Sequence, residues 1–432
     1  METAVTLLIT FALIGTSMPI AFALGLSALL ILLLFDGFFS LQFLPNILFG
    51  GLADFGLIAI PMFIVMGTVI ASTKASSDLY ESLHQWLYRV PGGLLISTIF
   101  ASMIFAALSG SSPATSAAVG KIAIPETKKR GYPAPLSAGT VAAGGTLGIL
   151  IPPSVTMIVY GVAAETSIGR LFIAGIIPGL MMVALFSLWI VVRIRWLGIG
   201  KEIASERVPL RERLRFLPRV LPFVSIIVLI LWALYGGVAS PSEAAGVAAF
   251  AAFVFAVVLY RIWQPRVIGR ILSEGVRESV MLMLIIGTSA LFAYALSSLY
   301  ITQSAAESII AMNLSPVMLM VLINIFLLIA GFFLPPVSII VMAIPILLPI
   351  IDAAGFNRIW FGVLMTLNME IGLITPPVGL NLYVLKGIAP DLSFGAIVRG
   401  SYPFMLLLVL GMVLLYAFPG LATWLPTALM GS

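Results

Sequence analysis

The stretch GTLGILIPPSVTM, residues 145–157, places two consecutive prolines inside a segment that otherwise has the composition of a membrane helix. Proline has no amide hydrogen, and its ring crowds the carbonyl one turn earlier, so Pro152 and Pro153 must interrupt the helical hydrogen bonds. Within lipid such a break persists only where it is buried in protein or lines a cavity, because unpaired backbone groups are costly there. The stretch therefore predicts a broken helix at a functional site.

The whole chain has the composition of a membrane protein. Of its 432 residues, 61% are hydrophobic and only 9% are charged, whereas a soluble domain carries roughly 25% charged residues. Apolar runs near the roughly 18 to 20 residues that cross a bilayer recur along the sequence, without the alternation of barrel strands. We therefore expect an all-α polytopic membrane protein whose N-terminal segment is a retained first helix. The sequence contains no cysteine, which excludes disulfides and thiolate chemistry.

The basic residues indicate how the helices are oriented. The largest basic cluster, at residues 193–219, has eight Lys or Arg against three acidic residues, and such clusters favour the cytoplasmic side. Most other basic clusters fall on that side only if residues 91–126 and 314–350 each form a re-entrant hairpin, which enters and leaves the membrane by the same face. We therefore predict two re-entrant helical hairpins.

The chain also contains an internal repeat. In a gap-free comparison of the sequence with itself at an offset of 224 residues, the matched pairs are Pro125 with Pro349, Gly131 with Gly355, Gly148 with Gly372, Pro152 with Pro376 and Pro153 with Pro377. The predicted orientation places the turn after the first hairpin in the cytoplasm and its counterpart outside, so the repeats are inverted. Inverted repeats are typical of transporters, whose substrate and ion sites lie between discontinuous helices near the membrane midplane.

The predicted hairpin tips carry chemistry that matches the breaks. The first tip, ALSGSSPATSAAVG, is dense in hydroxyl side chains, whereas the second, IAGFFLPPVSII, is poor in them. Carbonyls freed by the prolines are hard oxygen ligands for a cation, and the N-terminus of a half-helix favours an anion. Each break can therefore contribute to a sodium site and to a carboxylate site.

Four long motifs of the chain are similar to those of a known family. The segments SGSSPATSAAVGKIAIPE, GGTLGILIPPSVTMIVYGVAAETSIGRLFIAGIIPGL, SPSEAAGVAA and EIGLITPPVGLNLYVLKGIA occur in this order. They resemble the large membrane subunit of tripartite ATP-independent periplasmic (TRAP) transporters, over roughly residues 19–403. The resemblance implies sodium-coupled import of an organic acid across the bacterial inner membrane by an elevator mechanism. It also implies two partners, a periplasmic substrate-binding protein and a small four-helix membrane subunit.

The resemblance implies site residues as well. The first sodium site would use Ser109, Ser112, Gly148, Ile151 and Pro153, and the second would use Gly331, Gly372, Thr375 and Pro377. The residues expected to bind the substrate carboxylate are Ser111, Ser112, Thr115, Ser154 and Asn381. Relatives that resemble sialic acid transporters tend to have an aspartate just after the first tip, where this chain has residues 113–115 as Pro-Ala-Thr, so a small carboxylate is favoured.

The predicted organisation follows from the repeat and the resemblance together. First-repeat scaffold helices and an arm occupy 1–52, and a first-repeat transport region at 53–192 contains the hairpin 91–126, a broken helix at 134–163 and a following helix. The basic cytoplasmic linker at 193–219 leads to second-repeat scaffold helices and an arm at 220–277. A second-repeat transport region at 278–398 contains the hairpin 314–350 and a broken helix at 358–388, and a C-terminal helix occupies 399–432.

Ionisable groups within spans are costly and therefore of interest. Glu370 is expected either to tune the second ion site or to form a structural hydrogen bond with the facing hairpin. Glu243 is expected to make a structural or subunit contact, and Asp54 to be solvated at the external membrane edge.

Two other functions remain open at this point. A stand-alone carrier of the same architecture would need no binding protein. An intramembrane enzyme would need a cluster of acidic or histidine residues at a membrane edge, and such residues are few and scattered in this sequence.

Overall fold

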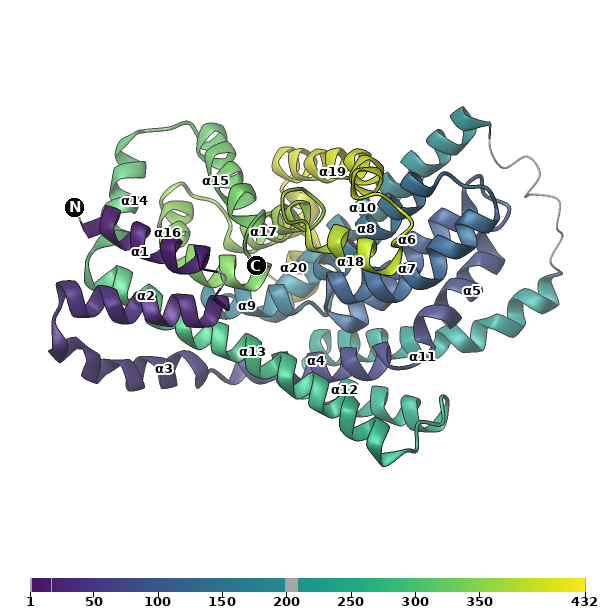
Figure 1. Ribbon diagram of the computed structural model, residues 1–432, viewed down its shortest axis with the longest axis horizontal. Helices are drawn as coiled ribbons and strands as arrows, with labels where there is room; N and C mark the ends of the chain where they lie inside the picture. The colour runs from purple at the N-terminus through teal and green to yellow at the C-terminus, as the bar shows by residue number, and fades with distance from the viewer. Residues whose placement is uncertain (1, 17, 199–208, 432) are drawn as a thin grey trace.

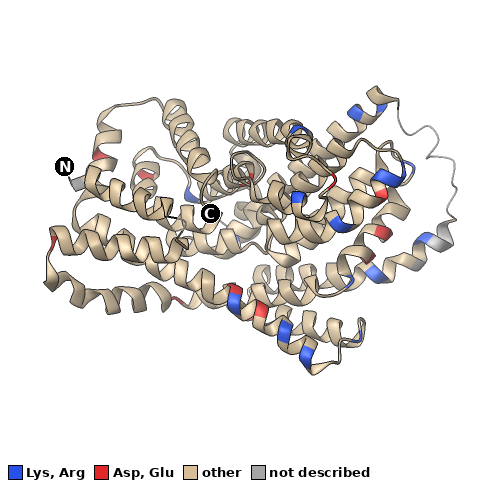
Figure 2. Cartoon of the chain, in the orientation of Figure 1, with Lys and Arg blue, Asp and Glu red and all other residues tan. Residues whose placement is uncertain are grey.

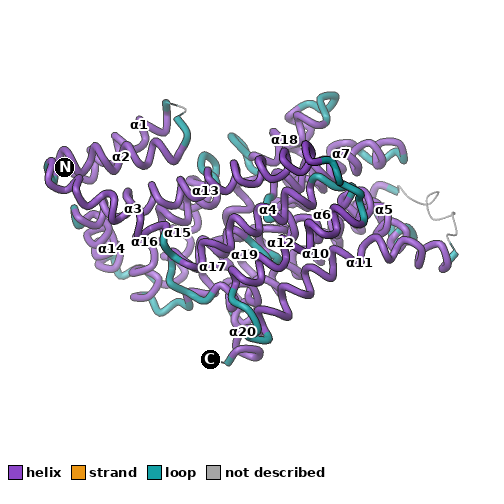
Figure 3. Tube along the Cα trace, turned by 90° about the horizontal axis from the view of Figure 1, so that it is seen from below, coloured by secondary structure: helices purple, strands orange, loops and turns teal. Residues whose placement is uncertain are grey.

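The computed structural model describes residues 2–16, 18–198 and 209–431. Over these residues the chain consists of helices and the turns that join them, without a strand (Figures 1 and 3). Within this part of the chain, six helices are long and apolar enough to cross a bilayer, or up to eight if two bent helix pairs each form one span. The prediction of an all-helical, multi-pass membrane protein is confirmed.

The first half of the chain ends in a long helix. Its elements are α1 (Glu2–Gly15), α2 (Ile20–Phe35), η1 (Phe38–Phe43), α3 (Leu44–Leu52), η2 (Phe55–Ile58), α4 (Ala59–Ala71), α5 (Ala75–Leu87), α6 (Gly93–Ser109), α7 (Ser112–Lys129), α8 (Ala134–Leu150), α9 (Val155–Ala163) and α10 (Ile168–Leu197).

The second half repeats this order with fewer short elements. It comprises α11 (Leu210–Tyr235), α12 (Pro241–Val258), α13 (Pro265–Ser298), α14 (Ile301–Ala311), α15 (Pro316–Gly331), α16 (Pro336–Ala353), α17 (Arg358–Leu373), α18 (Leu380–Ile388), α19 (Phe394–Ala417) and α20 (Gly420–Met430).

Two helical hairpins and two broken helices occupy equivalent places in the halves. Helices α6 and α7 form the first hairpin, and α15 and α16 form the second. Helix α8 is separated from α9 by residues 151–154, with a bend of 41°. Helix α17 is separated from α18 by residues 374–379. The Pro-Pro bond in each break is cis, and each broken helix covers the residue range that the sequence predicts.

Several predicted segment boundaries are wrong. Those at 192/193, 219/220, 277/278 and 398/399 fall inside the continuous helices α10, α11, α13 and α19. Hydropathy and charge change within a helix without ending it, so they are poor markers of its termini. Residues 199–208 of the linker lie outside the described residues. The C-terminal segment contains two helices rather than one, because Phe418 precedes Pro419 and leaves the helical region (φ −127°, ψ 73°).

The helices pack into two groups. Helices α2, α3, α4, α11 and α12 pack along α13 or along one another, and they form the scaffold group. This grouping differs from the predicted organisation, which placed α4 and the second half of α13 in the transport regions. The hairpins, the broken helices, α10 and α19 form the other group, the transport group (Figure 1). Within the transport group, each hairpin contacts the broken helix of the other repeat. Helix α7 of the first hairpin packs on α18, and α16 of the second hairpin packs on α9. Each hairpin therefore supports the far half of the other repeat's broken helix.

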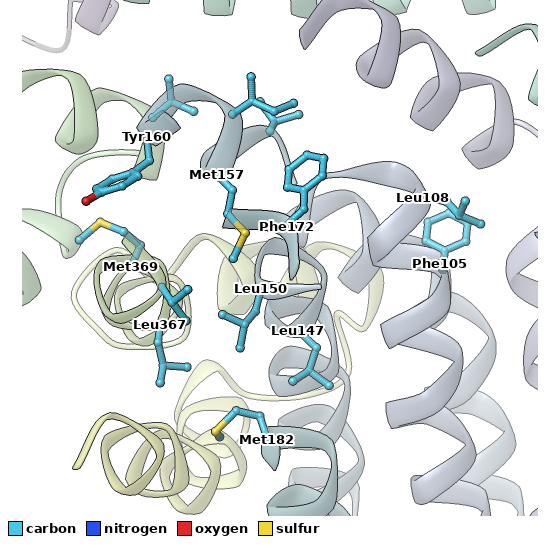
Figure 4. Close-up of a cluster of buried hydrophobic side chains, with 14 of the residues drawn as sticks. Phe105, Leu108, Leu147, Leu150, Met157, Tyr160, Phe172, Met182, Leu367 and Met369 are labelled. Atoms are coloured by element: carbon cyan, nitrogen blue, oxygen red, sulfur yellow. The ribbon is translucent and has the colours of Figure 1, made fainter. Parts of the chain in front are cut away.

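The first break sits in a dense apolar core. Figure 4 shows Leu147 and Leu150 of α8, Met157 of α9 and Phe172 of α10 around the interruption, with Leu367 of α17 beside them. All five side chains are buried. Close packing of this kind makes interiors resist displacement, so the backbone at the first break is firmly held.

Charged side chains are confined to a few parts of the fold. Figure 2 shows Lys and Arg gathered toward the right of the molecule and along α13, and few on the left. Helix α13 is 34 residues long, more than the roughly 20 that cross a bilayer. Its N-terminal turns carry Arg266, Arg270 and Arg277, so this end extends beyond the hydrophobic layer.

Candidate functional site

The tip of the first hairpin is a network of hydroxyl groups. Gly110 ends α6 with a left-handed conformation (φ 63°), and Ser111 begins α7, its side chain accepting a hydrogen bond from the amide of Ala114 at 3.4 Å. The hydroxyl oxygens of Ser109 and Thr115 lie 3.0 Å apart, and Thr115 donates to the carbonyl of Ser111 at 2.9 Å. The tip thus collects three hydroxyls and a backbone carbonyl within a single turn.

The first break lies directly against this hairpin. A Cβ built at Gly148 would collide with Ala106 of α6, and one built at Gly110 would lie 3.3 Å from Val155 of α9. Pro152 and Pro153 cannot donate to the carbonyls of Gly148 and Ile149, so those oxygens have no helical partner. The side chain of Ile151 packs toward Gly179 of α10. Ser154 caps α9 by accepting from the amide of Met157 at 3.3 Å.

At the second break, the backbone of the broken helix lies against the backbone of its hairpin. A Cβ built at Gly372 would lie 2.6 Å from the carbonyl oxygen of Gly331, at the end of α15. The hydroxyl of Thr375 donates to the carbonyl of Ile371 at 2.5 Å, so it turns back toward its own helix. Pro376 and Pro377 are exposed. The carbonyls of Gly372 and Leu373 lose the donors that these prolines lack, although the Gly372 carbonyl accepts a hydrogen bond from the amide of Thr375 at 3.4 Å.

Asn381 connects the two repeats at the first tip. It lies on α18, after the second break, and is fully buried. Its side-chain amide donates to the hydroxyl of Ser112 at 2.7 Å and to the carbonyl of Ala142 at 3.2 Å. Its Oδ1 atom has no hydrogen-bond partner among the described residues. Hairpin 1, α8 and α18 therefore meet at one buried polar point.

The predicted site residues lie in two groups in the structure. Around the first tip and break are Ser109, Ser111, Ser112, Thr115, Gly148, Ile151, Pro153, Ser154 and Asn381; around the second are Gly331, Gly372, Thr375 and Pro377. Ser154 and Thr375 hold local helix contacts in this conformation. Their assignment as ligands stays a prediction.

The oxygen atoms near the two breaks are suitable ligands for a hard cation such as Na⁺. Among the described residues, no group of three or more His, Asp or Glu side chains could hold a metal ion. The oxygens near both breaks are instead neutral hydroxyls and carbonyls, with fixed dipoles at the ends of half-helices. Carbonyl oxygens left free by a broken helix are the ligands used for Na⁺ in such proteins, so the residues present fit the ion.

Glu370 does not face the second tip. Because an α-helix turns about 100° per residue, Glu370 lies roughly 200° around α17 from Gly372, the residue that meets the hairpin. It is fully buried, and neither carboxylate oxygen has a hydrogen-bond partner among the described residues. The expected hydrogen bond to the hairpin is therefore absent from the described structure, and Glu370 does not line the second site.

The other two acidic candidates cap helices. Asp54 is exposed and accepts a hydrogen bond from the amide of Gly56 at 2.6 Å, which starts η2. Glu243 forms a capping box with Ser240 at the start of α12. Both carboxylates therefore have structural roles in this conformation, and Asp54 is exposed as expected.

Two asparagine side chains, buried Asn368 and partly buried Asn324, form a pair that the sequence did not predict. Asn368 of α17 donates to the side-chain oxygen of Asn324 on α15 at 3.0 Å, and to the Asn324 carbonyl at 2.9 Å. The sequence contained a signal, because each asparagine lies within a largely apolar helix. These bonds join the second hairpin to the second broken helix about one turn before the break.

Repeated membrane helices, paired hairpins and paired helix breaks define an integral-membrane permease of the transporter class. A family model described as "Tripartite ATP-independent periplasmic transporter, DctM component" matches residues 7–421. The chain therefore belongs to the TRAP transporter family, as its large membrane subunit. It is a transporter permease and not an enzyme.

Named relatives agree with this family. The chain is 41% identical to the C4-dicarboxylate TRAP transporter large permease protein DctM of Pseudomonas aeruginosa, an alignment that covers 94% of this chain and 93% of that protein. It is 34% identical to the protein of the same name from Vibrio cholerae, with 100% and 99% covered. Among solved structures, the YdaH transporter of Alcanivorax borkumensis aligns at 16% identity with a TM-score of 0.63, covering 89% of each chain. This likeness concerns the fold alone.

Proposed function

We propose that this permease imports a C4-dicarboxylate across the bacterial inner membrane, driven by the inward movement of Na⁺. The observation that supports this most directly is the pairing of each helix break with a hairpin tip. The substrate class is supported by relatives that are named for C4-dicarboxylates. The proposal also places residues 193–219 in the cytoplasm, on the basis of their charge.

The residues near the first tip have defined roles in this proposal. The hydroxyls of Ser109 and Ser112 and the backbone oxygens of Gly148, Ile151 and Pro153 hold one Na⁺. The backbone oxygens of Gly331, Gly372 and Pro377, with the Thr375 hydroxyl, hold a second. One substrate carboxylate lies between the tips, bound by Ser111, Ser112, Thr115, Ser154 and Asn381 and favoured by the positive N-terminal ends of α9 and α18.

Two partner proteins complete the proposed transporter. The family name supports a periplasmic substrate-binding protein, which delivers the acid, and a small four-helix membrane subunit, which stabilises the permease. The binding protein captures the substrate when the substrate is at low concentration. A stand-alone carrier would transport without either partner, so their requirement distinguishes the two functions.

Reconstitution tests the function directly. The complete complex, placed in proteoliposomes with an imposed sodium gradient, is expected to accumulate malate, succinate or fumarate when the loaded binding protein is present. Sialic acid and isethionate serve as comparison substrates, and a potassium gradient as the ion control. Equal uptake without the sodium gradient would contradict sodium coupling, and equal uptake without the binding protein would favour the stand-alone carrier.

We further propose that the transport group slides against the scaffold as an elevator. The groups meet where η2, which packs on α4 and α12 of the scaffold, faces α9: a Cβ built at Gly56 would lie 3.4 Å from the side chain of Val162. A disulfide in the double variant Gly56→Cys/Val162→Cys should stop uptake, and its reduction should restore it. The matched control is Gly25→Cys/Thr288→Cys, whose positions meet between α2 and α13 within the scaffold. Continued uptake by the oxidised first variant would contradict the elevator.

A further inference from the structure

Two arginines, Arg170 and Arg358, lie outside the basic clusters that are predicted to be cytoplasmic. In the structure each donates to a carbonyl at the C-terminal end of a helix. Arg170 bonds the carbonyl of Met430 in α20 at 3.4 Å, and Arg358 bonds that of Ala164, the C-cap of α9, at 3.3 Å. A cation is favoured at such an end because its carbonyls carry partial negative charge. Of the two helices held in this way, only α9 belongs to a break.

Arg358 also contacts the second hairpin. It begins α17, and its guanidinium binds the carboxylate of Asp352, in the last turn of α16, through two nitrogens. The distance from Nε to Oδ1 is 2.9 Å and that from Nη2 to Oδ2 is 2.5 Å. This two-point contact fixes the plane of the guanidinium, and the third nitrogen, Nη1, donates to Ala164. One side chain therefore joins α16, α17 and α9.

Helix α9 donates a hydrogen bond back to the same residue. The hydroxyl of Tyr160 donates to the backbone carbonyl of Arg358 at 2.6 Å. Tyr160 and Ala164 are four residues apart, so they lie on one face of α9. The buried ring of Tyr160 lies against Gly362, one turn into α17, where a Cβ would be 2.5 Å from it. We call these contacts, together with the pair to Asp352, the Arg358 latch.

The first repeat has no arginine in the equivalent place. At the 224-residue offset, Arg358 corresponds to Ala134 and Asp352 to Lys128. Lys128 pairs instead with Asp391, in the turn after α18, at 3.5 Å. The side chains of that pair are 63% and 80% exposed, against 39% for each partner in the Asp352–Arg358 pair. The better buried link, which also reaches a broken helix, is therefore a feature of the second repeat.

The latch lies at the opposite end of α9 from the first break. Helix α9 has nine residues, so its two ends are only about 13 Å apart. Its first turn directly follows Pro153 and Ser154, which belong to the predicted ion and substrate sites. A tilt of so short a helix about its C-terminal end displaces its N-terminal end, and with it the carbonyl of Pro153. Arg358 can therefore set the geometry of a site that it does not touch.

We propose that Arg358 is a positioning residue that ties α9 to the second hairpin and so holds the N-terminal end of α9 at the first break. Its effect on transport rests on the proposed function, because the ion and substrate sites are those assigned there. Arg358 touches neither the predicted ions nor the substrate. It acts through Tyr160 and Ala164 on the helix that adjoins them.

Amide hydrogen exchange in the purified permease with its small subunit tests the positioning without reference to transport. The amides of Met157 and Ile158 bond Ser154 at the far end of α9. In Arg358→Met their exchange should become about two- to fivefold faster, because local opening follows the free energy that partly exposed contacts supply. A contact of local importance only would change exchange at residues 161–164 and leave the far end unchanged.

The sodium concentration that gives half-maximal uptake tests the consequence for transport. In Arg358→Met it should rise about two- to fivefold, because a displaced Pro153 carbonyl coordinates the ion less well. Arg358→Lys should restore only part of the loss, since an ammonium cannot hold Asp352 and Ala164 in one planar fork. Tyr160→Phe should raise the sodium concentration in the same direction. This variant leaves the charge of the protein unchanged, so it separates the latch from any effect of charge on the binding protein.

The matched control is Arg170→Met, which removes the other arginine that bonds a helix-terminal carbonyl, on a helix that belongs to neither break. Exchange in α9 and sodium activation should both stay native there. Native exchange at Met157 and Ile158 in Arg358→Met would overturn the proposal, and so would equal changes in Arg170→Met. Faster exchange with native sodium activation, or no sodium activation in the unmodified complex, would count against the proposed function, and the exchange result would still decide the positioning.

Discussion

The two helix breaks share a motif but differ in their surroundings. Pro152 and Pro153 are buried, with the hydroxyl-rich tip of hairpin 1 packed beside them, whereas Pro376 and Pro377 are exposed. At the first break, side chains of the neighbouring helices α6 and α10 pack against the backbone. At the second, the backbone of Gly331 lies against Gly372, and the side chains of Met405 and Tyr383 contact Thr375 and Pro377. The repeat thus preserves the interruption of the backbone, while the chemistry around each interruption has diverged.

The divergence extends into the helices that lead to the breaks. At the 224-residue offset, Asn324, Asn368 and Glu370 of the second half correspond to Phe100, Gly144 and Thr146 of the first. The second broken helix therefore contains a buried amide and a buried carboxyl, and its hairpin a partly buried amide, where the first half has glycine, threonine and phenylalanine. The two sites therefore differ at these positions, whereas both keep the paired prolines.

The largest effect is expected where the first break is tightest. Gly148→Val should disrupt the packing of α8 on α6, because even a Cβ at this position collides with Ala106. Overpacking in a dense interior costs about 1–3 kcal/mol or more, and uptake should be lost. The thermal midpoint of the purified complex measures the loss of stability, and uptake into proteoliposomes measures the loss of transport.

The control for this substitution lies at the second tip. At Gly331 a Cβ would meet no atom closer than 3.6 Å, so Gly331→Ala should leave the midpoint nearly unchanged. Equal destabilisation by Gly148→Val and Gly331→Ala would contradict the expectation that position 331 has room for a methyl group and position 148 has none.

Asn381→Leu should have the next largest effect, because it removes the hydrogen bonds that cross between the repeats. Loss of bonds from a fully buried amide costs about 1–3 kcal/mol. We expect a lower thermal midpoint and a higher KM for the dicarboxylate. Asn46→Leu, at an exposed position on α3, is the control. A normal KM in Asn381→Leu would show that the Asn381 side chain does not bind the substrate.

Glu370→Leu should stabilise the protein. A fully buried carboxyl without a hydrogen-bond partner is unfavourable, and its replacement by an apolar group of similar size should raise the stability by about 1–3 kcal/mol. The thermal midpoint should rise, and Glu370→Gln should have a smaller effect. Loss of sodium-driven uptake in a stably folded Glu370→Leu variant would show instead that the carboxylate takes part in ion coupling.

The smallest effect is expected at Ser154. It caps α9, whereas α18 begins at Gly379 without a side-chain cap. Ser154→Ala should lower the stability by about 1 kcal/mol, the usual contribution of a cap, as measured by the thermal midpoint. Gly379→Ser should not stabilise α18, because residue 379 is left-handed (φ 51°). A gain there would mean that the second break can rearrange to accept a cap.

The sequence was most informative where backbone chemistry is obligatory. Paired prolines cannot be accommodated in a regular helix, so both broken helices were predicted at the residues where they occur. The sequence was less informative about which partner each polar side chain contacts. Thr375 bonds its own helix and Glu370 faces away from the hairpin, and both depend on rotamers and helix phase that spacing along the chain does not determine. Asn381 was predicted as a site residue, but its bond to Ser112, 269 residues away, required the folded chain.

The sodium dependence of uptake tests the central claim most directly, namely that both helix breaks hold sodium and that the first does so through side chains. For Ser109→Ala, the sodium concentration that gives half-maximal dicarboxylate uptake should rise about tenfold, equivalent to ~1.4 kcal/mol. Thr375→Ala should give a smaller rise, because the Thr375 hydroxyl already bonds Ile371. Unchanged sodium activation in Ser109→Ala, with normal amounts of folded complex, would contradict the assignment of sodium to the first break.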